Sequence, residues 1–112
     1  GIRMSLRQQL ADALKSGKYK FGRIKLINED GCNCVLGVAC AISNLQTGIC
    51  GPYDDIPCFY YHDKCFTHIP PKFIRDQLDS EGIDWAGLII LNDRSENYDE
   101  CIKYLETGVI PQ

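Results

Sequence analysis

The sequence of 112 residues has little of several features that mark large classes of protein. It contains one Met, one Trp and two His. It has no run of about 18 apolar residues that could cross a membrane, and no segment that resembles a secretory signal. Basic and acidic residues number 12 and 15, so the surplus of Lys and Arg that drives nucleic-acid binding is absent. We therefore expect a soluble, cytoplasmic protein with neither a membrane nor a nucleic acid as its partner.

The length fits a single small domain. A chain of this size buries roughly 65% of the surface that its unfolded form exposes, which is enough for one core without a metal or a disulfide. We expect residues 1–3 to be a non-native remnant and Met4 to be the initiator, so that residues 4–112 form one globular domain. Charge is uneven along the chain. Residues 1–56 carry seven basic and five acidic side chains, whereas residues 57–112 carry five and ten.

Seven cysteines are the most unusual feature of the composition. Their number is odd and no export signal precedes them, so a closed disulfide framework is not expected. Cysteine is among the most buried residue types, and we expect most of these thiols to be reduced and inside the core. For each candidate cysteine site, a buried structural thiol is therefore the alternative interpretation.

Apolar periodicity and capping signals predict about five helices. Ser5 and Gln8 form a capping box at the start of the first helix, which Gly17 ends. Residues 35–45 are apolar on nearly every side, which is typical of a central helix surrounded by protein. Three further helices are expected to begin at Pro70–Pro71, Asp84 and Asn97.

Two parts of the sequence predict short antiparallel hairpins. Residues 23–27 alternate largely as a strand, and residues 32–34 can return as its partner after a turn that contains glycine. Residues 58–61 and 65–69 form a second candidate pair of strands, for which a helix is the alternative. The stretch 49–57 is predicted to be an exposed loop. The sequence thus predicts a small α+β domain, with about five helices packed around one or two short β-hairpins.

Cys34 is a candidate nucleophile because it precedes the predicted helix 35–45. Unpaired backbone N–H groups at a helix N-terminus stabilise a thiolate. A cysteine hydrolase or transferase also needs a base and an orienting group, which His68 and then Asn92 or Asp93 can supply. No Gln or Gly-rich oxyanion segment precedes Cys34, and a half-buried structural thiol is the competing interpretation.

The segment 58–68 holds a dense run of metal-ligand types, namely Cys58, His62, Cys65 and His68. Their spacing matches no strong structural zinc motif. Cys58, His62 and Cys65 share one face only if the segment is helical. We therefore predict no metal and no other cofactor, with zinc at these four residues as the alternative.

The loop after the first helix has the most ligand-like composition of the chain. Lys18 and Lys20 alternate with Tyr19 and Phe21 between two glycines, and Arg23 follows the second glycine. Mobile cations beside aromatic rings can hold a phosphate or a nucleotide-like molecule by charge and stacking. The loop has the spacing of no phosphate-binding motif, and a solvated basic loop is the alternative.

The order of four motifs along nearly the whole chain is distinctive. The motifs are the segment ALKSGKYKFGR from Ala13, the segment CVLGVAC from Cys34, Ile69-Pro70-Pro71, and Leu91-Asn92-Asp93 followed by Tyr98-x-x-Cys-Ile. This order resembles a family of small uncharacterised proteins that tailed bacteriophages and prophages encode. The chain departs from the family pattern at Asn33, where a second adjacent Cys is common, and in the segment 58–68. The resemblance implies a bacteriophage setting and supplies no mechanism.

Together these features predict a non-enzymatic accessory protein of a bacteriophage that acts in the cytoplasm of the host cell. We expect it to bind a host protein or an anionic, nucleotide-like small molecule, in host takeover or counter-defence. The alternative is a cysteine-dependent hydrolase or transferase that uses Cys34 with His68 as its base. The sequence leaves open whether the chain forms a homo-oligomer.

Overall fold

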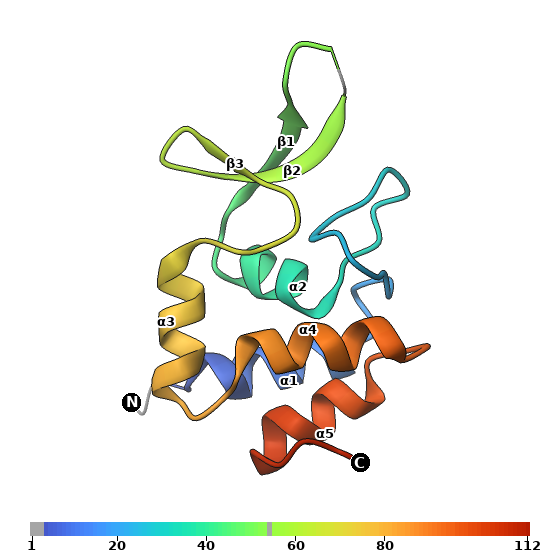
Figure 1. Ribbon diagram of the computed structural model, residues 1–112, viewed down its shortest axis with the longest axis vertical. Helices are drawn as coiled ribbons and strands as arrows, with labels where there is room; N and C mark the ends of the chain where they lie inside the picture. The colour runs from blue at the N-terminus through green and yellow to red at the C-terminus, as the bar shows by residue number, and fades with distance from the viewer. Residues whose placement is uncertain (1–3, 54) are drawn as a thin grey trace.

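Helices form the body of the protein, and a small antiparallel sheet projects from one end of it (Figure 1). The computed structural model describes residues 4–53 and 55–112, so the predicted remnant 1–3 lies outside the described residues. The five helices of the described part are α1 (Leu6–Lys15), α2 (Val35–Ile42), α3 (Lys72–Ser80), α4 (Trp85–Arg94) and α5 (Asp99–Thr107). Its strands are β1 (Gln46–Cys50), β2 (Ile56–Tyr61) and β3 (Lys64–Phe66). The predicted α+β fold is confirmed.

The start of α1 is capped from two directions. Ser5 Oγ accepts a hydrogen bond from Gln8 N at 3.2 Å, as the capping box predicts. The carboxylate of Glu81, which follows α3, accepts from the backbone N–H groups of Leu6 and Arg7 at 3.0 and 2.6 Å. A negative charge at a helix N-terminus is favourable, so this contact ties α1 to the end of α3.

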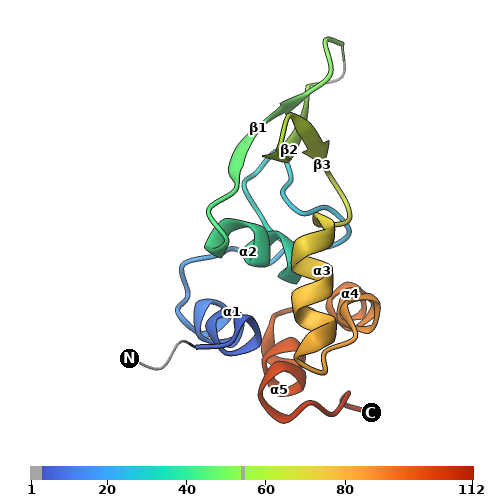
Figure 2. The same cartoon turned by 90° about the vertical axis from the view of Figure 1, so that its left-hand side faces the viewer.

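The central helix α2 lies between the sheet and the other helices, and it packs on α1 and α4 (Figures 1 and 2). Residues 35–40 are all buried, as its apolar sequence predicts. The helix ends at Ile42 and not at residue 45, because Asn44 adopts a left-handed φ of 65° and the chain then turns into β1.

The hairpin predicted from residues 23–27 and 32–34 does not form. Ile24 has a φ of 70°, a conformation that a regular strand does not contain. Leu26 N donates to Thr67 O at 2.8 Å, so this buried residue bonds to the segment after β3 and not to a hairpin partner. The stretch is an irregular loop that bonds both to residues 32–34, for example through Cys34 N to Lys25 O at 3.2 Å, and to distant parts of the chain.

The second predicted hairpin forms as β2 and β3, in a sheet of order β1-β2-β3, but β2 begins at Ile56 and the second strand spans Lys64–Phe66 in place of residues 65–69. His62 and Asp63 form its two-residue turn with φ values of 49° and 64°, as a type I′ turn requires. The strand β1 is a correction, because residues 46–50 were expected to lie at a helix end and in the exposed loop 49–57. Its backbone pairs with β2, which the local sequence does not indicate.

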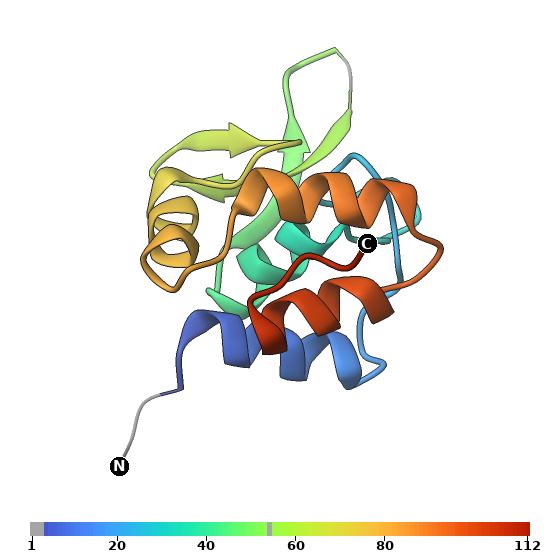
Figure 3. The same ribbon diagram turned by 60° about the horizontal axis from the view of Figure 1, so that its bottom comes forward.

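The remaining helices begin near their predicted starts. Asp84 Oδ1 accepts from Ala86 N at 3.1 Å and caps α4. Asn97 Oδ1 accepts from Asp99 N at 2.9 Å, so α5 begins two residues after the predicted cap. Figure 3 shows α5 beside α4 and α1, on the side of the body away from the sheet. No helix of the described residues has the length and apolar character needed to cross a membrane.

Candidate functional site

Cys34 stands at the N-cap of α2, as predicted, but it is buried with only 4% of its surface exposed. Burial raises the pKa of its thiol to about 11, and this effect outweighs the backbone N–H groups of Gly37 and Leu36, which lower it. The thiol is therefore protonated at neutral pH. A helix N-terminus activates a cysteine only when solvent or substrate can reach it.

The predicted base, His68, makes no hydrogen bond to this thiol in the part of the chain that the structure describes. His68 is exposed, and its Nδ1 is 2.9 Å from Thr67 Oγ1. Among the described residues, no hydrogen bond joins the His68 ring to Cys34. The pair therefore lacks the contact through which a histidine would take a thiol proton.

Asn92 has a structural role at the same helix end. It is fully buried, and its Oδ1 accepts from Val35 N at 2.9 Å, so it caps α2 from α4. Its Nδ2 donates to Gly22 O at 2.9 Å. The neighbouring Asp93 accepts from Ile24 N at 2.9 Å. Both side chains hold the loop before α2 in place, and neither orients the predicted base.

The order in which the thiols react tests this account of Cys34. At neutral pH we expect iodoacetamide to modify Cys65 first and Cys34 only slowly, in the group of buried thiols that includes Cys40 and Cys101, because only the thiolate reacts and burial keeps these thiols protonated. The rate at Cys34 should rise only as the pH approaches about 11. Peptide mass spectrometry after timed labelling gives each rate, with the half-buried Cys32 as an internal reference. Rapid labelling of Cys34 below neutral pH would restore the enzyme hypothesis.

The basic loop uses most of its predicted ligand-binding side chains within the fold. Phe21 is half-buried and meets the edge of the Tyr98 ring with 5.2 Å between centroids. Arg23 Nε donates to Ser95 O at 3.0 Å, and its guanidinium lies over the Phe21 ring. Tyr19 packs against the core cluster. These three side chains fasten the loop to α4, α5 and the core.

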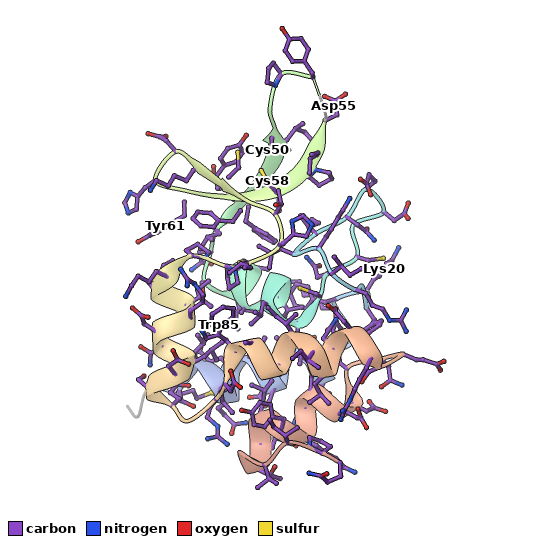
Figure 4. The ribbon with its side chains drawn as sticks, in the orientation of Figure 1. Lys20, Cys50, Asp55, Cys58, Tyr61 and Trp85 are labelled. Atoms are coloured by element: carbon purple, nitrogen blue, oxygen red, sulfur yellow. The ribbon has the colours of Figure 1, made fainter. Side chains whose placement is uncertain are left out.

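Two lysines of the loop stay exposed. Lys18 Nζ lies 5.7 Å from the centroid of the Tyr19 ring, and Lys20 belongs to the same segment (Figure 4). The backbone under Lys20 is fixed, because its carbonyl accepts from Asn33 N at 2.8 Å and from the Tyr98 hydroxyl at 3.0 Å. No salt bridge in the described part of the chain involves either lysine. The loop therefore offers two unpaired positive charges on a fixed backbone.

Three cysteines, one from each strand, meet on one face of the sheet. The Sγ atoms of Cys50, Cys58 and Cys65 all lie within 4.8 Å of one another. The register explains the meeting: Cys65 pairs with Tyr60, and Cys50 pairs with Ile56, so each is opposite a residue two positions from Cys58. Residues two apart in a strand share a face, so all three thiols project to the same side. Figure 4 shows Cys50 and Cys58 on the neighbouring strands.

This face of the sheet is separate from the main core. Cys58 has no exposed surface, yet it is not part of the core cluster, which holds its neighbour Phe59 on the opposite face. Tyr60 donates a hydrogen bond from its hydroxyl to Ile49 O, so its ring reaches across to β1. A Cβ at Gly48 would lie 2.2 Å from Tyr60 Cε2, so the ring occupies the place of a side chain there. Tyr60 thus covers the residue that pairs with Cys58.

The thiols of this cluster differ in acidity. Hydrogen bonding between Cys50 and Cys65 raises the pKa of Cys50 to about 11 and lowers the pKa of Cys65 below its usual value. Burial is the main reason that the pKa of Cys58 is raised. Cys65 is therefore the thiol that ionises first, with Cys50 as its hydrogen-bond donor.

The structure brings together a different set of metal-ligand residues from the predicted set. Cys58 and Cys65 do come together, but their third partner is Cys50, which sequence spacing did not single out with them. His62 lies in the exposed turn between β2 and β3, and His68 is exposed beside Thr67. Neither histidine joins the cluster of ligand atoms. Cys50 could be assigned to the cluster only from the register of β1 with β2, and the sequence did not predict β1.

The hairpin of β1 and β2 projects beyond the body of the protein (Figure 2), and it carries exposed apolar side chains. Ile49 in β1 exposes 52% of its surface, and Tyr53 in the connection to β2 exposes 91%. Ile49 pairs with Pro57, two residues from the buried Phe59, so this apolar face continues outward from the core. Apolar side chains that lie together at the surface mark contact sites for other molecules more often than single exposed ones do.

The fold and its sites define a small α+β protein with a buried cysteine at a helix end and a projecting, thiol-bearing sheet. Comparison of the chain with protein-family models, with curated proteins and with solved structures finds no match. Its function is therefore inferred from its own residues.

Proposed function

We propose that this protein is an accessory protein of a tailed bacteriophage or prophage, and that it acts inside the host cell as a non-enzymatic binding module for a host protein. The bacteriophage setting comes from the motif order described above. The non-enzymatic character is supported by the burial of Cys34, the lack of a hydrogen bond between it and the His68 ring among the described residues, and the structural use of Asn92. A site for the chemistry of a cysteine hydrolase would need all three to be arranged differently.

The projecting β1–β2 hairpin is the observation that carries the choice of a protein partner. Ile49 and Tyr53 present apolar surface that no helix covers, and Tyr53 is the type of side chain that is enriched at protein interfaces. The outer edge of β1 offers backbone groups to a further strand, because β1 pairs only with β2 in the described sheet. An edge strand with apolar neighbours favours a protein partner over a small molecule.

An anionic small molecule is the second candidate ligand, and the exposed Lys18 and Lys20 favour it. Their charges stand on a backbone that Asn33 and Tyr98 fix by hydrogen bonds, so little ordering is needed on binding. Phe21 packs against Tyr98, and Arg23 donates to Ser95 O. Neither side chain is therefore free to stack on a nucleotide base. Charge alone would then hold the ligand, with a strong dependence on salt.

The experiment compares wild type with two double variants, I49K/Y53K on the hairpin and K18E/K20E on the loop. Each immobilised protein is used to capture partners from a bacterial lysate, and the captured host protein is then purified and titrated against each variant by calorimetry. We expect I49K/Y53K to weaken binding by at least about 100-fold, since two apolar anchors of an interface are lost. K18E/K20E should bind as wild type does.

The single variant I90K is a matched control, because Ile90 is 65% exposed on α4, far from the hairpin. Circular dichroism and thermal unfolding should agree for all four proteins, which separates lost binding from lost folding. If the purified partner binds I49K/Y53K as tightly as wild type, the hairpin is not the interface. A nucleotide released by denaturing the wild type and missing from K18E/K20E would replace the protein partner with the anionic ligand.

A further inference from the structure

We propose that Cys50, Cys58 and Cys65 bind one zinc ion that joins the three strands of the sheet. Each cysteine comes from a different strand, and the three Sγ atoms already lie within 4.8 Å of one another. Bound zinc holds its sulfur ligands at about 2.3 Å, which places tetrahedrally arranged sulfurs about 3.8 Å apart. The longest separation therefore needs to shorten by about 1 Å, within the reach of side-chain rotation.

The surroundings of the cluster keep the three sulfurs together without a metal. The strand register fixes their relative positions, and the Tyr60 ring, held across β1 by its bond to Ile49 O, covers the position next to Cys58. Cys58 has no exposed surface, although it does not belong to the main core. A buried thiol surrounded by two other thiols gives little packing benefit, whereas it completes a set of metal ligands.

Zinc fits this set better than a monovalent soft ion. Both Zn²⁺ and Cu⁺ accept thiolate ligands. Three thiolates leave a net charge of −1 around Zn²⁺ and −2 around Cu⁺, and a partly buried site disfavours the larger charge. Cys50 and Cys65 are half-buried, so solvent can reach the cluster and supply the fourth zinc ligand as water. Binding displaces thiol protons, so the affinity should fall as the pH falls.

The ion would act on the least supported part of the fold. The sheet has three short strands, and only its inner face reaches the core, through Phe59 and Phe66. A two-stranded hairpin without a second packed layer is marginally stable in water, and β1 and β2 extend beyond the part of the sheet that meets the core (Figure 2). One ion bound to all three strands would replace that missing layer, and it would hold the projecting hairpin in a single conformation.

The test uses the reduced full chain, with zinc added under a thiol-free reductant and the product measured by native mass spectrometry. We expect one zinc per chain in wild type and in Cys32→Ser, which changes a half-buried cysteine outside the cluster. Cys50→Ser and Cys65→Ser should bind zinc at least about 100-fold more weakly, as measured by competition with a chromophoric chelator. Replacing zinc by Co²⁺ should give an intense sulfur-to-metal charge-transfer band in wild type and in Cys32→Ser, and a much weaker band or none in Cys50→Ser and Cys65→Ser.

Stability measurements keep the test valid if a serine variant folds poorly. Zinc should raise the melting temperature of wild type and of Cys32→Ser, and slow amide exchange in β1, β2 and β3, without effect on Cys65→Ser. The proposal fails if wild type holds no zinc against the chelator, or if Cys65→Ser binds it equally well. A 1:1 complex with Cu⁺ but not with Zn²⁺ would overturn the assignment to zinc. A disulfide between two of the three cysteines that persists under reductant would also overturn it.

Discussion

Replacing Gly37 by alanine is expected to lower the free energy of unfolding by at least about 3 kcal/mol, or to prevent folding altogether. A Cβ at this position would lie 1.7 Å from Leu26 O and 2.6 Å from Leu26 C. Both are backbone atoms, and Leu26 is fully buried and bonded to Thr67, so neither can move aside without breaking other contacts. The irregular loop before α2 packs directly on the helix backbone at this point.

Gly87→Ala in α4 is the matched control for this substitution. A Cβ there would lie 3.0 Å from Asp84 Oδ2, the end of a movable side chain, and alanine is favoured over glycine within a helix by about 1 kcal/mol. We expect Gly87→Ala to change stability by less than about 1 kcal/mol. Chemical denaturation of both variants measures the difference. If Gly37→Ala unfolds at the same denaturant concentration as wild type, the close contact with Leu26 is not present in solution.

Replacing Asn92 by alanine is the second change with a large expected effect, a loss of about 3 kcal/mol in the free energy of unfolding. The variant leaves two backbone groups without their partners, the buried Val35 N–H at the start of α2 and the partly buried Gly22 C=O in the loop. Each unsatisfied group costs about 1–3 kcal/mol. No water can replace the side chain easily, because Asn92 is fully buried.

The neighbouring substitution Asp93→Ala shows how much of this effect depends on burial. It removes the bond to Ile24 N, which lies at an exposed residue where water can take the place of the carboxylate. We expect a loss below about 1 kcal/mol, measured in the same denaturation series. Equal losses for Asn92→Ala and Asp93→Ala would contradict the capping role assigned to Asn92.

Gly37 and Asn92 belong to the motifs that carry the bacteriophage resemblance. Gly37 lies in the Cys34–Cys40 segment, and Asn92 in Leu91-Asn92-Asp93. In the structure both residues act on the same contact, the packing of the loop before α2 against α2 and α4. These motif residues therefore have a physical reason to be present that requires no catalysis.

The helices were predictable because their signals are local. Ser5, Asp84 and Asn97 mark helix starts by hydrogen bonds to residues two or three positions away, and the structure contains those bonds. The turn between β2 and β3 was predicted to within one residue, because apolar and aromatic residues flank it on both sides, but Lys64 lies in β3 and not in the turn. Local bonding of this kind leaves a direct trace in the sequence.

The loop before α2 and the strand β1 could not be predicted for the opposite reason. Leu26 bonds to Thr67, and β1 exists because β2 lies beside it. The alternation in residues 23–27 looks like a strand, but Ile24 turns the chain at a positive φ that is unusual for a branched residue. Hydrogen bonds to distant residues therefore decide the conformation here, against the strand that the local alternation of apolar residues predicts.

In the candidate sites too, features set by nearby residues were predictable and features set by distant contacts were not. The position of Cys34 at a helix N-terminus was predicted, whereas its burial was not, since burial depends on the loop that covers the helix end. The meeting of Cys58 and Cys65 depends on the two-residue turn at His62 and Asp63, which pairs Cys65 with Tyr60 and which the predicted strand bounds did not define. Cys50 joins them only through the register of β1, and the histidines that the spacing suggested point to other surroundings.

Mass spectrometry of the protein with its captured host partner, under native and then denaturing conditions, tests the central claim most directly. A non-enzymatic binding module predicts a non-covalent complex under native conditions, and two components of unchanged mass after denaturation. A covalent adduct on Cys34, or a mass change in the partner that disappears in Cys34→Ala, would contradict the claim and establish the protein as a cysteine enzyme.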